Sequence, residues 1–302
     1  MSADSPITII TAWGEGFGNG HIQRMIFLYH LLRDKGYVPL IVTDSDPASL
    51  NNSGCRFTDT VPGESRLIIR DMRDSTPAEI QSLKSTAPVV VIDDCGEGRR
   101  YADLAIDLLP HPDHPLPSSD FSACPFLFGF NFVNAMTRFS GIPFEKDIDI
   151  LIYTGLNPSP EYLSFIHTCI PEGWKTLLAD GNECALCAGG IKTGEVISYA
   201  ESLLRSKILL THFGISLFEG NLCGCALASV NPTEYHSSLA RLVRDSMGVI
   251  NFGVFGEINP ADVKKGLKEI TVASERTDGT IIRKSIMRHA ELFLERIEQF
   301  IR

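Results

Sequence analysis

The sequence of 302 residues lacks a long apolar run and lacks an excess of positive charge. Its most apolar stretch, 208–218, is interrupted by Thr211, His212 and Gly214, and is far shorter than the ~20 apolar residues of a membrane span. The 27 Lys and Arg against 37 Asp and Glu give a net charge of −10. That charge repels a phosphate backbone, so neither a membrane span nor a nucleic-acid partner is predicted.

Cysteine is also scarce, because 8 residues in a chain of this length are too few for a disulfide scaffold. The first residues, MSADSPITIITAWGEG, lack the basic start and apolar region of a secretory signal, which predicts a cytoplasmic protein with reduced thiols. Cys184 and Cys187, with Cys223 and Cys225, offer four thiols that can hold zinc. The second pair lies in an apolar stretch, which favours buried thiols, so no metal or other cofactor is predicted.

What is present is the composition of a folded protein, with 44% hydrophobic and 21% charged residues. At about 100–200 residues per domain, the length predicts two domains. The first half alternates β-branched apolar segments with amphipathic ones, which predicts a parallel sheet. Its expected strands are 7–12, 38–43, 66–70, 89–92 and 105–109, and its expected helices are 21–35 and 77–85.

The alternation starts again after the segment 140–147, which reads as a linker. The expected strands there are 148–153, 174–178, 208–210 and 226–230, with helices at 161–169, 195–204, 215–222 and 234–247. The predicted domains are 1–143 and 144–280, followed by a closing helix at 281–302. The fold class is α/β, with two doubly wound Rossmann-like domains facing each other across a cleft and ligands beyond the carboxyl ends of the strands.

A glycine-rich segment precedes the first helix, with glycine at 14, 16, 18 and 20. Glycine allows close backbone approach, and the free amides of a helix start attract an anion, although a plain surface loop is the alternative. A dinucleotide fingerprint fails because its third glycine falls on His21. A phosphate-loop NTPase fails because no Gly-Lys-Ser/Thr follows.

His21 and Arg24 follow this segment in the first helical turn. The helix dipole disfavours an imidazolium there and leaves a neutral ring that can act as a general base. Arg24 projects from the same face and can position an anionic group or a carboxylate near His21. A structural histidine is the alternative.

The segment 18–24, GNGHIQR, resembles the G-x-G-H-x-x-R element of the UDP-sugar hydrolases of pseudaminic acid biosynthesis, which are relatives of the MurG-type glycosyltransferases with the GT-B fold. The resemblance recurs at 89–96, 129–139 and 211–222. It implies that His21 is the catalytic base, and that Gly214 and Glu219 lie at the nucleotide. A helix that starts at 214 independently suits a diphosphate.

Asp93 and Asp94 follow a predicted strand, where they can position a sugar hydroxyl, support His21 or simply cap a turn. The candidate catalytic residues are therefore His21, Arg24 and Asp94. The candidate substrate-binding and nucleotide-binding residues are Gly18, Asn19, Gly20, Asp93, Thr154, Gly155, His212, Phe213, Gly214, Ser216, Glu219 and His236.

The sequence also departs from the family pattern. A Gly-Gly pair is replaced by 153–157, YTGLN, and an Asn-Gln pair by 234–236, EYH. The first hypothesis is a hydrolase that releases UDP from a UDP-linked amino or deoxy sugar in surface-glycan or nonulosonic acid biosynthesis, with His21 activating water. The alternatives are a GT-B glycosyltransferase that uses a UDP-sugar donor, and a noncatalytic protein that binds nucleotide sugars. The only predicted partner is the small nucleotide-sugar substrate, and the oligomeric state stays open.

Overall fold

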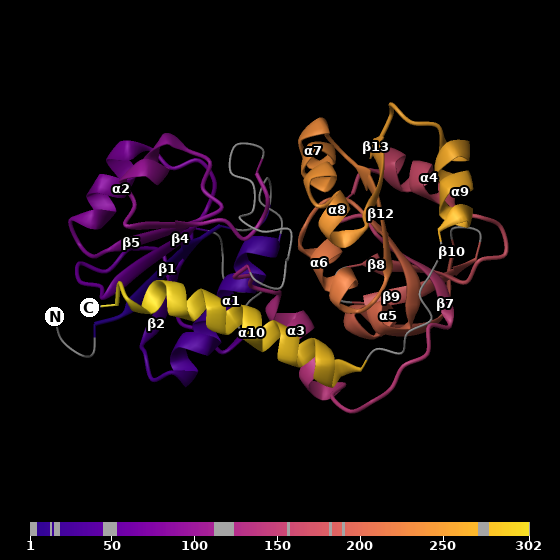
Figure 1. Cartoon of the computed structure of the whole chain (residues 1–302). Coiled ribbons are helices and arrows are strands. Elements are labelled where there is room, and N and C mark those ends of the chain that lie inside the picture. Colours follow the sequence, from indigo (N-terminus) through magenta and orange to yellow (C-terminus); the bar gives the residue numbers. More distant parts are fainter. Residues whose placement is uncertain are drawn as a thin grey trace. The chain divides into compact units, whose positions relative to one another are not determined.

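The computed structural model describes residues 5–12, 14, 19–44, 53–111, 124–155, 158–180, 183–188, 191–270 and 278–301 (Figure 1). Internal contacts divide the chain into two units. Unit 1 contains Met1–Leu109, Leu116–Phe130 and Ile286–Arg302, and unit 2 contains Pro110–Pro115 and Asn131–Ser285. The predicted limits of the domains, and the cleft between them, stay predictions.

Unit 1 contains a six-stranded parallel sheet in the order β3-β2-β1-β4-β5-β6. The strands are β1 (Ile7–Thr11), β2 (Pro39–Val42), β3 (Phe57–Thr58), β4 (Leu67–Asp71), β5 (Val89–Ile92) and β6 (Leu104–Ile106). Its helical segments include α1 (Gly20–Asp34), α2 (Pro77–Lys84) and the 3₁₀ turn η2 (Glu97–Tyr101). This is the strand order of a Rossmann sheet, and the βα alternation predicted it.

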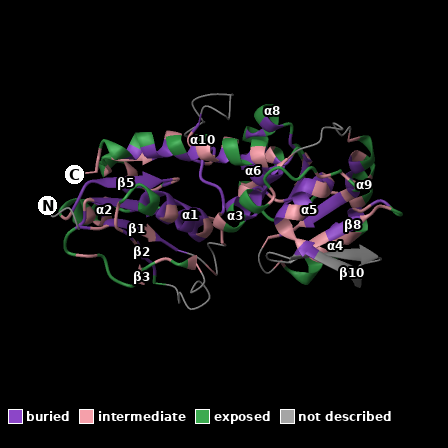
Figure 2. Ribbon diagram, turned by 90° about the horizontal axis from the view of Figure 1, so that it is seen from below, coloured by how far each residue is buried: buried purple, intermediate pink, exposed green. Residues whose placement is uncertain are grey.

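The helix α1 is buried on nearly all sides, which explains its apolar sequence. Ten of its fifteen residues are buried, including His21 and Arg24 (Figure 2). The shorter helix α2 starts at a capping box, in which the Thr76 side chain accepts from the Glu79 amide and the Glu79 side chain accepts in return. Proline in its first turn marks the same start, as the sequence predicted.

Unit 2 contains a seven-stranded sheet in the order β10-β9-β8-β7-β11-β12-β13. Five strands run parallel: β7 (Ile148–Tyr153), β8 (Thr176–Asp180), β11 (Ser206–Thr211), β12 (Ala226–Asn231) and β13 (Ile250–Val254). β9 (Glu183–Ala188) and β10 (Ile191–Ser198) extend the sheet as an antiparallel hairpin. The helices with residues in unit 2 are α3 (Phe130–Arg138), α4 (Pro160–Cys169), α5 (Tyr199–Arg205), α6 (Ile215–Leu222), α7 (Glu234–Leu242), α8 (Arg244–Met247), α9 (Pro260–Glu269) and the first part of α10 (Gly279–Glu298).

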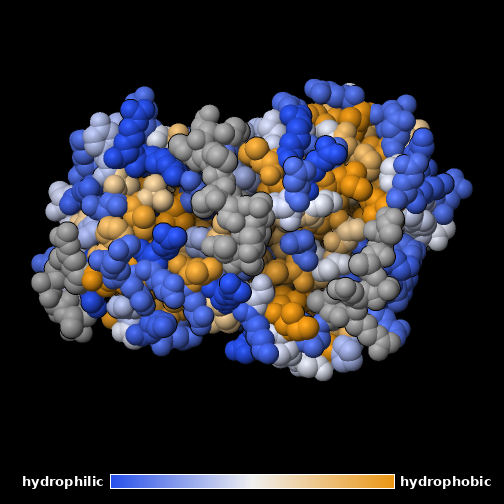
Figure 3. Space-filling view, viewed as in Figure 1, coloured by the Kyte–Doolittle hydropathy of each residue, from blue (hydrophilic) through white to orange (hydrophobic). Residues whose placement is uncertain are grey.

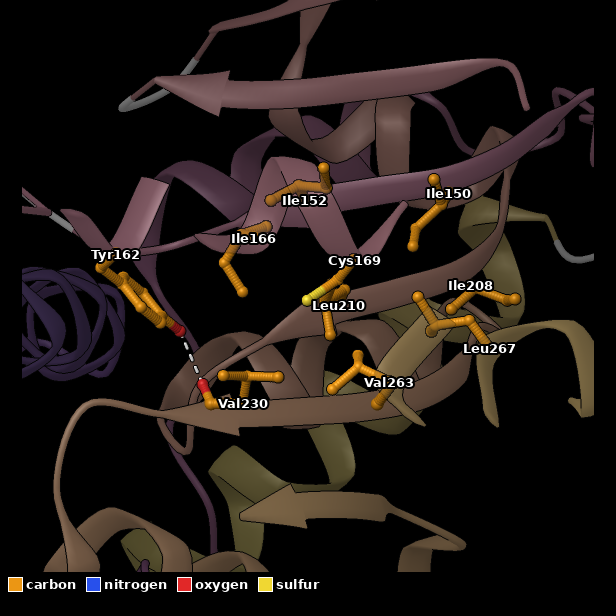
Figure 4. Close-up of a cluster of buried hydrophobic side chains, with 11 residues drawn as sticks. Ile150, Ile152, Tyr162, Ile166, Cys169, Ile208, Leu210, Val230, Val263 and Leu267 are labelled. Carbon is orange, nitrogen blue, oxygen red and sulfur yellow. Dashed lines mark hydrogen bonds between the residues drawn. The ribbon is translucent and has the colours of Figure 1, made fainter. Parts of the chain in front are cut away.

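One face of this sheet packs on α4 and α9 and forms the core shown in Figure 4. Ile152 of β7 and Leu210 of β11 are at most 1% exposed there. The Tyr162 hydroxyl of α4 donates to the Val230 carbonyl over 2.6 Å, so the aromatic ring is buried without an unpaired polar end (Figure 4). This face is apolar throughout, and the polar residues of the candidate site lie elsewhere.

The prediction of a helix over 195–204 was wrong in its first part. Glu195 to Ser198 belong to β10, whose Val196 pairs with Ala185 of β9. The helix α5 begins only at Tyr199, because the Ser198 hydroxyl accepts from the Glu201 amide and caps it. The predicted helix over 234–247 is interrupted at Val243, which separates α7 from α8.

The C-terminal helix α10 has residues in both units. Ile286, Ala290, Phe293 and Ile297 are fully buried, which confirms the predicted apolar face (Figure 2). His289 is 2% exposed, and its Nδ1 donates to the Cys124 carbonyl oxygen of unit 1 over 2.7 Å. The later part of α10 is therefore an integral part of the core of unit 1.

The surface in Figure 3 is mostly hydrophilic over the helices, with hydrophobic residues visible around β13 in unit 2. Leu242, the last residue of α7, is 44% exposed, and Ile250, the first residue of β13, is 40% exposed. Within the described ranges, no helix has the length and hydropathy of a membrane span.

Candidate functional site

In unit 1, polar residues gather at the carboxyl edge of the sheet where the strand order reverses. β1 and β4 are adjacent there, although two strands separate them in the sequence. In such sheets, ligands bind beyond the carboxyl ends of the strands where the strand order reverses. Asp71 is the last residue of β4, Asp93 directly follows β5, and α1 begins at Gly20. The first turn of α1 contributes His21.

His21 contacts the Asp71 carboxylate. Its Nδ1 lies 2.8 Å from Asp71 Oδ1, and the two side chains are 10% and 0% exposed. A carboxylate only accepts, so Nδ1 carries the proton, and Nε2 is the nitrogen that bears the lone pair when the ring is neutral. The geometry therefore fixes one tautomer and presents Nε2 as a proton acceptor, which is the arrangement of a histidine general base with its orienting carboxylate.

Arg24 holds the same carboxylate from the next turn of α1. Its Nε donates to Asp71 Oδ2 over 2.7 Å, and a terminal nitrogen donates to Oδ1 over 2.5 Å. Burial alone would raise the pKa of the Asp71 carboxyl, but the charge of Arg24 lowers it well below its ordinary range. Asp71 therefore remains an anion. Of the two predicted roles for Arg24, the structure shows the positioning of a carboxylate.

Asp93 is the second carboxylate on Arg24, and its Oδ2 lies 2.7 Å from a terminal guanidinium nitrogen. Its Oδ1 accepts from the backbone amides of Leu108 and Leu109 over 2.7 and 2.9 Å. The backbone of Asp93 has φ +49°, a left-handed conformation that is uncommon outside glycine. Burial, reinforced by the charge of Asp71, raises the pKa of Asp93 against the opposing effect of Arg24.

Asp94 belongs to a different network, although it is the neighbour of Asp93. Its Oδ1 accepts from the amides of Ser75 and Gly96 over 3.0 and 2.8 Å, and its Oδ2 lies 3.3 Å from Arg70. These contacts tie the segment after β4 to the segment after β5. The carboxylate on His21 is Asp71, so the support for His21 that the sequence analysis allowed to Asp94 comes from Asp71 instead.

Two further predicted residues, Asn19 and Gly20, lie at the start of α1, and Thr11 is a residue that the sequence did not indicate. Gly18 lies outside the described residues, Asn19 occupies the N-cap position without a side-chain cap, and Gly20 is the first helical residue. Thr11 pairs in register with Asp71, so both side chains lie on the same face of the sheet. Thr11 is 1% exposed, and its hydroxyl has no hydrogen-bond partner in the described chain.

In unit 2, the strand order reverses between β7 and β11, and aromatic rings meet at the carboxyl ends of these strands. His212 follows β11 and stacks on Tyr153, the last residue of β7, with centroids 6.5 Å apart and planes 20° apart. His236 of α7 meets the His212 ring edge to face at 5.7 Å. The structure thus brings together the predicted residues His212 and His236. The third ring is Tyr153, which was not a predicted site residue and belongs to the segment 153–157 that departs from the family pattern.

Gly155 lies directly against the His212 ring. It has φ +86°, and a Cβ added there would fall 2.6 Å from His212 Cε1. Glycine is therefore required both for its backbone conformation and for its size. Burial, and secondarily the charge of His236, lowers the pKa of His212 to about 4. His212 is neutral at pH 7, and its Nδ1 has no hydrogen-bond partner in the described chain.

The segment after His212 leads into α6. Phe213 is buried, and its amide donates to the Asn231 side chain over 2.9 Å. Gly214 is the N-cap in an extended conformation, which leaves the first amides of α6 without a side-chain cap. Ser216 and Glu219 lie in the first turns and are 5% and 4% exposed.

The pKa of Tyr153 shows that its hydroxyl is close enough to Glu219 to be affected by the charge of that carboxylate. Burial, and then the negative charge of Glu219, raises the pKa of Tyr153 to about 12. Thr154, which follows Tyr153, is buried at 7% exposure. Four of the predicted binding residues of this half, Thr154, Phe213, Ser216 and Glu219, are thus buried, and the other four are partly buried.

The zinc alternative concerned four cysteines, of which the structure describes two side chains. Cys223 and Cys225 are 0% and 7% exposed, and the Cys225 thiol donates to the Leu203 carbonyl over 3.2 Å. The side chains of Cys184 and Cys187 lie outside the described residues. Within the described part, no three His, Cys, Asp or Glu side chains are grouped as metal ligands.

Comparisons with known proteins identify the architecture. No family model and no curated protein matches the sequence. The chain is similar to the crystal structure of the glycotransferase of kitacinnamycin, with a TM-score of 0.63 at 12% identity and 100% of each chain covered. It is also similar to the spinosyn rhamnosyltransferase complexed with spinosyn aglycone, with a TM-score of 0.59 at 10% identity, over 97% of this chain and 100% of that chain.

A crystal structure of UDP-N-acetylglucosamine 2-epimerase is a third neighbour, with a TM-score of 0.52 at 10% identity over 98% of this chain and 97% of that chain. The spinosyn rhamnosyltransferase has also been crystallised with thymidine diphosphate. The two Rossmann-like α/β units and the neighbouring structures show that this chain has the GT-B fold, which was the predicted fold class. The particular family of hydrolases named from the motifs has no support in these comparisons.

Proposed function

We propose that the protein is a glycosyltransferase that moves a sugar from a nucleotide sugar to an acceptor hydroxyl in the cytoplasm. The observation that carries this proposal is the His21–Asp71 contact of 2.8 Å at the carboxyl edge of the unit 1 sheet. The Nδ1 proton is committed to Asp71, so Nε2 is the atom that accepts the hydroxyl proton as the oxygen attacks the anomeric carbon. Asp71 then stabilises the imidazolium that forms.

The nucleotide is assigned to unit 2. The uncapped start of α6 at Gly214 offers backbone amides and the positive end of a helix dipole to a diphosphate. Gly155 makes room for the His212 ring at this edge, and Glu219 is assigned to the ribose hydroxyls. When the bond to the sugar breaks, the same amides stabilise the negative charge on the leaving diphosphate. The remaining candidates, Thr154, Phe213, Ser216 and His236, are assigned to the surroundings of the nucleotide.

Hydrolysis is the second candidate reaction, because the same imidazole can deprotonate a water molecule. It would release UDP from a UDP-linked amino or deoxy sugar, as the motif resemblance implies. The glycosyltransferase is placed first because two of the neighbouring structures are named as glycosyltransferases and both are covered over their full length.

The test separates transfer, hydrolysis and simple binding. The protein is incubated with UDP-sugars and thymidine diphosphate sugars, and the free nucleoside diphosphate is measured with and without a panel of hydroxylated acceptors. Release that requires an acceptor is expected. Release without any acceptor identifies a hydrolase, and nucleotide binding without release identifies a noncatalytic binder. The variant His21→Asn is expected to bind nucleotide normally and to lose turnover about 10²–10⁴-fold.

Thr11→Val is a second, independent check on the unit 1 site. The variant replaces a buried hydroxyl without a partner by a methyl group of the same shape, so the free energy of unfolding should rise by about 1 kcal/mol. If the hydroxyl contacts substrate beside His21, kcat/KM should fall about tenfold at the same time. Thermal unfolding and initial rates measure the two effects.

The control is Thr8→Val in the same strand. The Thr8 hydroxyl is 2.7 Å from the Ser65 hydroxyl, and both residues are buried. This variant leaves Ser65 without its partner, so it should lower stability and leave kcat/KM unchanged. A Thr11→Val protein that is more stable and equally active would show that the Thr11 hydroxyl has no part in the reaction.

A further inference from the structure

The contacts around Arg24 form a chain of charged groups longer than a catalytic pair requires. One terminal nitrogen of Arg24 lies 2.5 Å from Asp71, 2.7 Å from Asp93 and 3.3 Å from His21 Nδ1. The ring nitrogen of His21 and the Asp93 carboxylate are therefore within about 6 Å of each other. Two carboxylates share one guanidinium at this point, and only one of them contacts the histidine.

A single carboxylate would already neutralise Arg24. The charge of Asp93 comes in addition, so Arg24, Asp71 and Asp93 together carry a net negative charge beside the His21 ring. This excess charge is buried, because the side chains of Arg24, Asp71 and Asp93 are 4%, 0% and 10% exposed. Burying a charge without full compensation is costly, and Asp93 also adopts an unfavourable φ. Asp93 therefore costs the folded protein stability in two ways, through the burial of its charge and through its left-handed backbone.

Resting on the proposed function, we infer that Asp93 is a positioning residue that acts through Arg24, holding Asp71 on His21 and making the imidazole a stronger base. Asp93 is itself held by the amides of Leu108 and Leu109, which fix one carboxylate oxygen and direct the other at Arg24. A negative charge near the ring favours the imidazolium, so it strengthens the base at the moment of proton transfer.

The other charged and titratable groups in the described surroundings leave this assignment intact. Cys95 follows Asp93 in the same segment, and burial raises the pKa of its thiol to about 11, so it carries no charge at pH 7. Asp107 lies next to the amides that hold Asp93, and its carboxylate is paired with Arg99 over 2.6 and 2.8 Å. From α1 and β4, Arg24 and Asp71 contact His21 directly, and Asp93 from the segment after β5 contacts Arg24.

The test removes the charge and follows His21 directly. Asp93→Asn keeps an oxygen acceptor for the two amides, and asparagine tolerates the left-handed backbone. Asp93→Gly is the second charge-free variant, because glycine adopts a positive φ without penalty. The probe is NMR titration of the His21 ring in the full-length protein, with the resonance assigned by its absence in His21→Asn. Initial rates with a turned-over nucleotide sugar give the matching pH profile.

Both variants should move the midpoint of the His21 titration to lower pH by about one unit, the effect of one charge at about 6 Å in a partly buried site. The acid limb of the kcat/KM profile should also move to lower pH, because an imidazole that is a weaker base becomes protonated only at lower pH. The plateau rate should fall a few-fold. The control Asp107→Asn removes the charge of a carboxylate that is paired with Arg99, and it should shift neither.

A midpoint that stays within about 0.2 unit of the wild-type value in both variants overturns the inference, since a purely structural Asp93 changes stability only. An equal shift in Asp107→Asn also overturns it, because the effect would then come from the general field. If the midpoint moves but no nucleotide sugar is consumed by any form of the protein, the role of Asp93 stands and the proposed function fails.

Discussion

Replacing Asp71 with asparagine is expected to lower kcat by about 10²–10⁴-fold, while the KM for the nucleotide sugar changes little. The amide can donate to His21 Nδ1 or accept from it, so the ring is no longer fixed as the tautomer with a free Nε2 lone pair. The imidazolium that forms in the transition state also loses the charge that stabilises it. Steady-state rates at saturating donor measure this loss.

The same substitution should lower the free energy of unfolding by about 1.5–3 kcal/mol. Arg24 makes two hydrogen bonds to Asp71 in a fully buried position, and the variant replaces this charged acceptor by a neutral amide, while Asp93 still balances the charge of Arg24. The comparison with His21→Asn separates the two consequences, because that variant removes the base and keeps the Arg24–Asp71 pair. Both should be inactive, and Asp71→Asn should be the more destabilised of the two. Full activity of either variant contradicts the assignment of the base.

Lowering the pH should weaken the Arg24–Asp71 ion pair. The pKa of Asp71 is lowered in the folded state, so its contribution to stability is complete above the ordinary pKa of an aspartate and is lost as the pH falls towards the folded-state value. Asp93 has a raised pKa and acts with the opposite sign. The two carboxylates on one guanidinium therefore do not titrate as equivalent groups.

Gly155→Ala is expected to reduce the affinity for UDP at least tenfold. The new Cβ would lie 2.6 Å from His212 Cε1, a distance that the ring can relieve only by moving away from Tyr153 and His236. The positive φ adds a backbone penalty of about 1–2 kcal/mol. Calorimetric titration with UDP measures the affinity, and thermal unfolding measures the stability.

Gly173→Ala is the matched control. Gly173 has φ +81°, close to the +86° of Gly155, and an added Cβ meets no atom within 4 Å. The control therefore carries the backbone penalty without the collision. If the two variants bind UDP equally well, the contact between Gly155 and His212 has no part in nucleotide recognition, and the assignment of the nucleotide to this edge of unit 2 loses its support.

The architecture could be predicted from the sequence because local patterns determine it. Apolar β-branched segments such as 89–92 become buried parallel strands, and the spacing in 286–297 becomes the buried face of α10. The antiparallel hairpin of β9 and β10 was missed because βα alternation was extended across it. The signal against a helix at 195 was Ser198, three residues before Glu201, which marks a helix start.

The candidate site was only partly predictable. His21 and Arg24 were found because they sit beside a glycine segment at a strand–helix junction, which is a local signal. Asp71 is 50 residues from His21 in the sequence, and only the register of β4 beside β1 brings the two together. An acidic residue at the end of a buried strand was the one available sign, and the predicted strand stopped at Arg70.

The path of the chain through α10 limits how this protein can be divided. Unit 1 is built from three separate stretches, and the last of them supplies Phe293 and Ile297 to its core. A fragment that stops near residue 143 would lack that helix and expose the apolar side chains that pack against it. A stand-alone version of the histidine-bearing half therefore has to splice the chain after Phe130 to the helix at Ile286, rather than end where the linker begins.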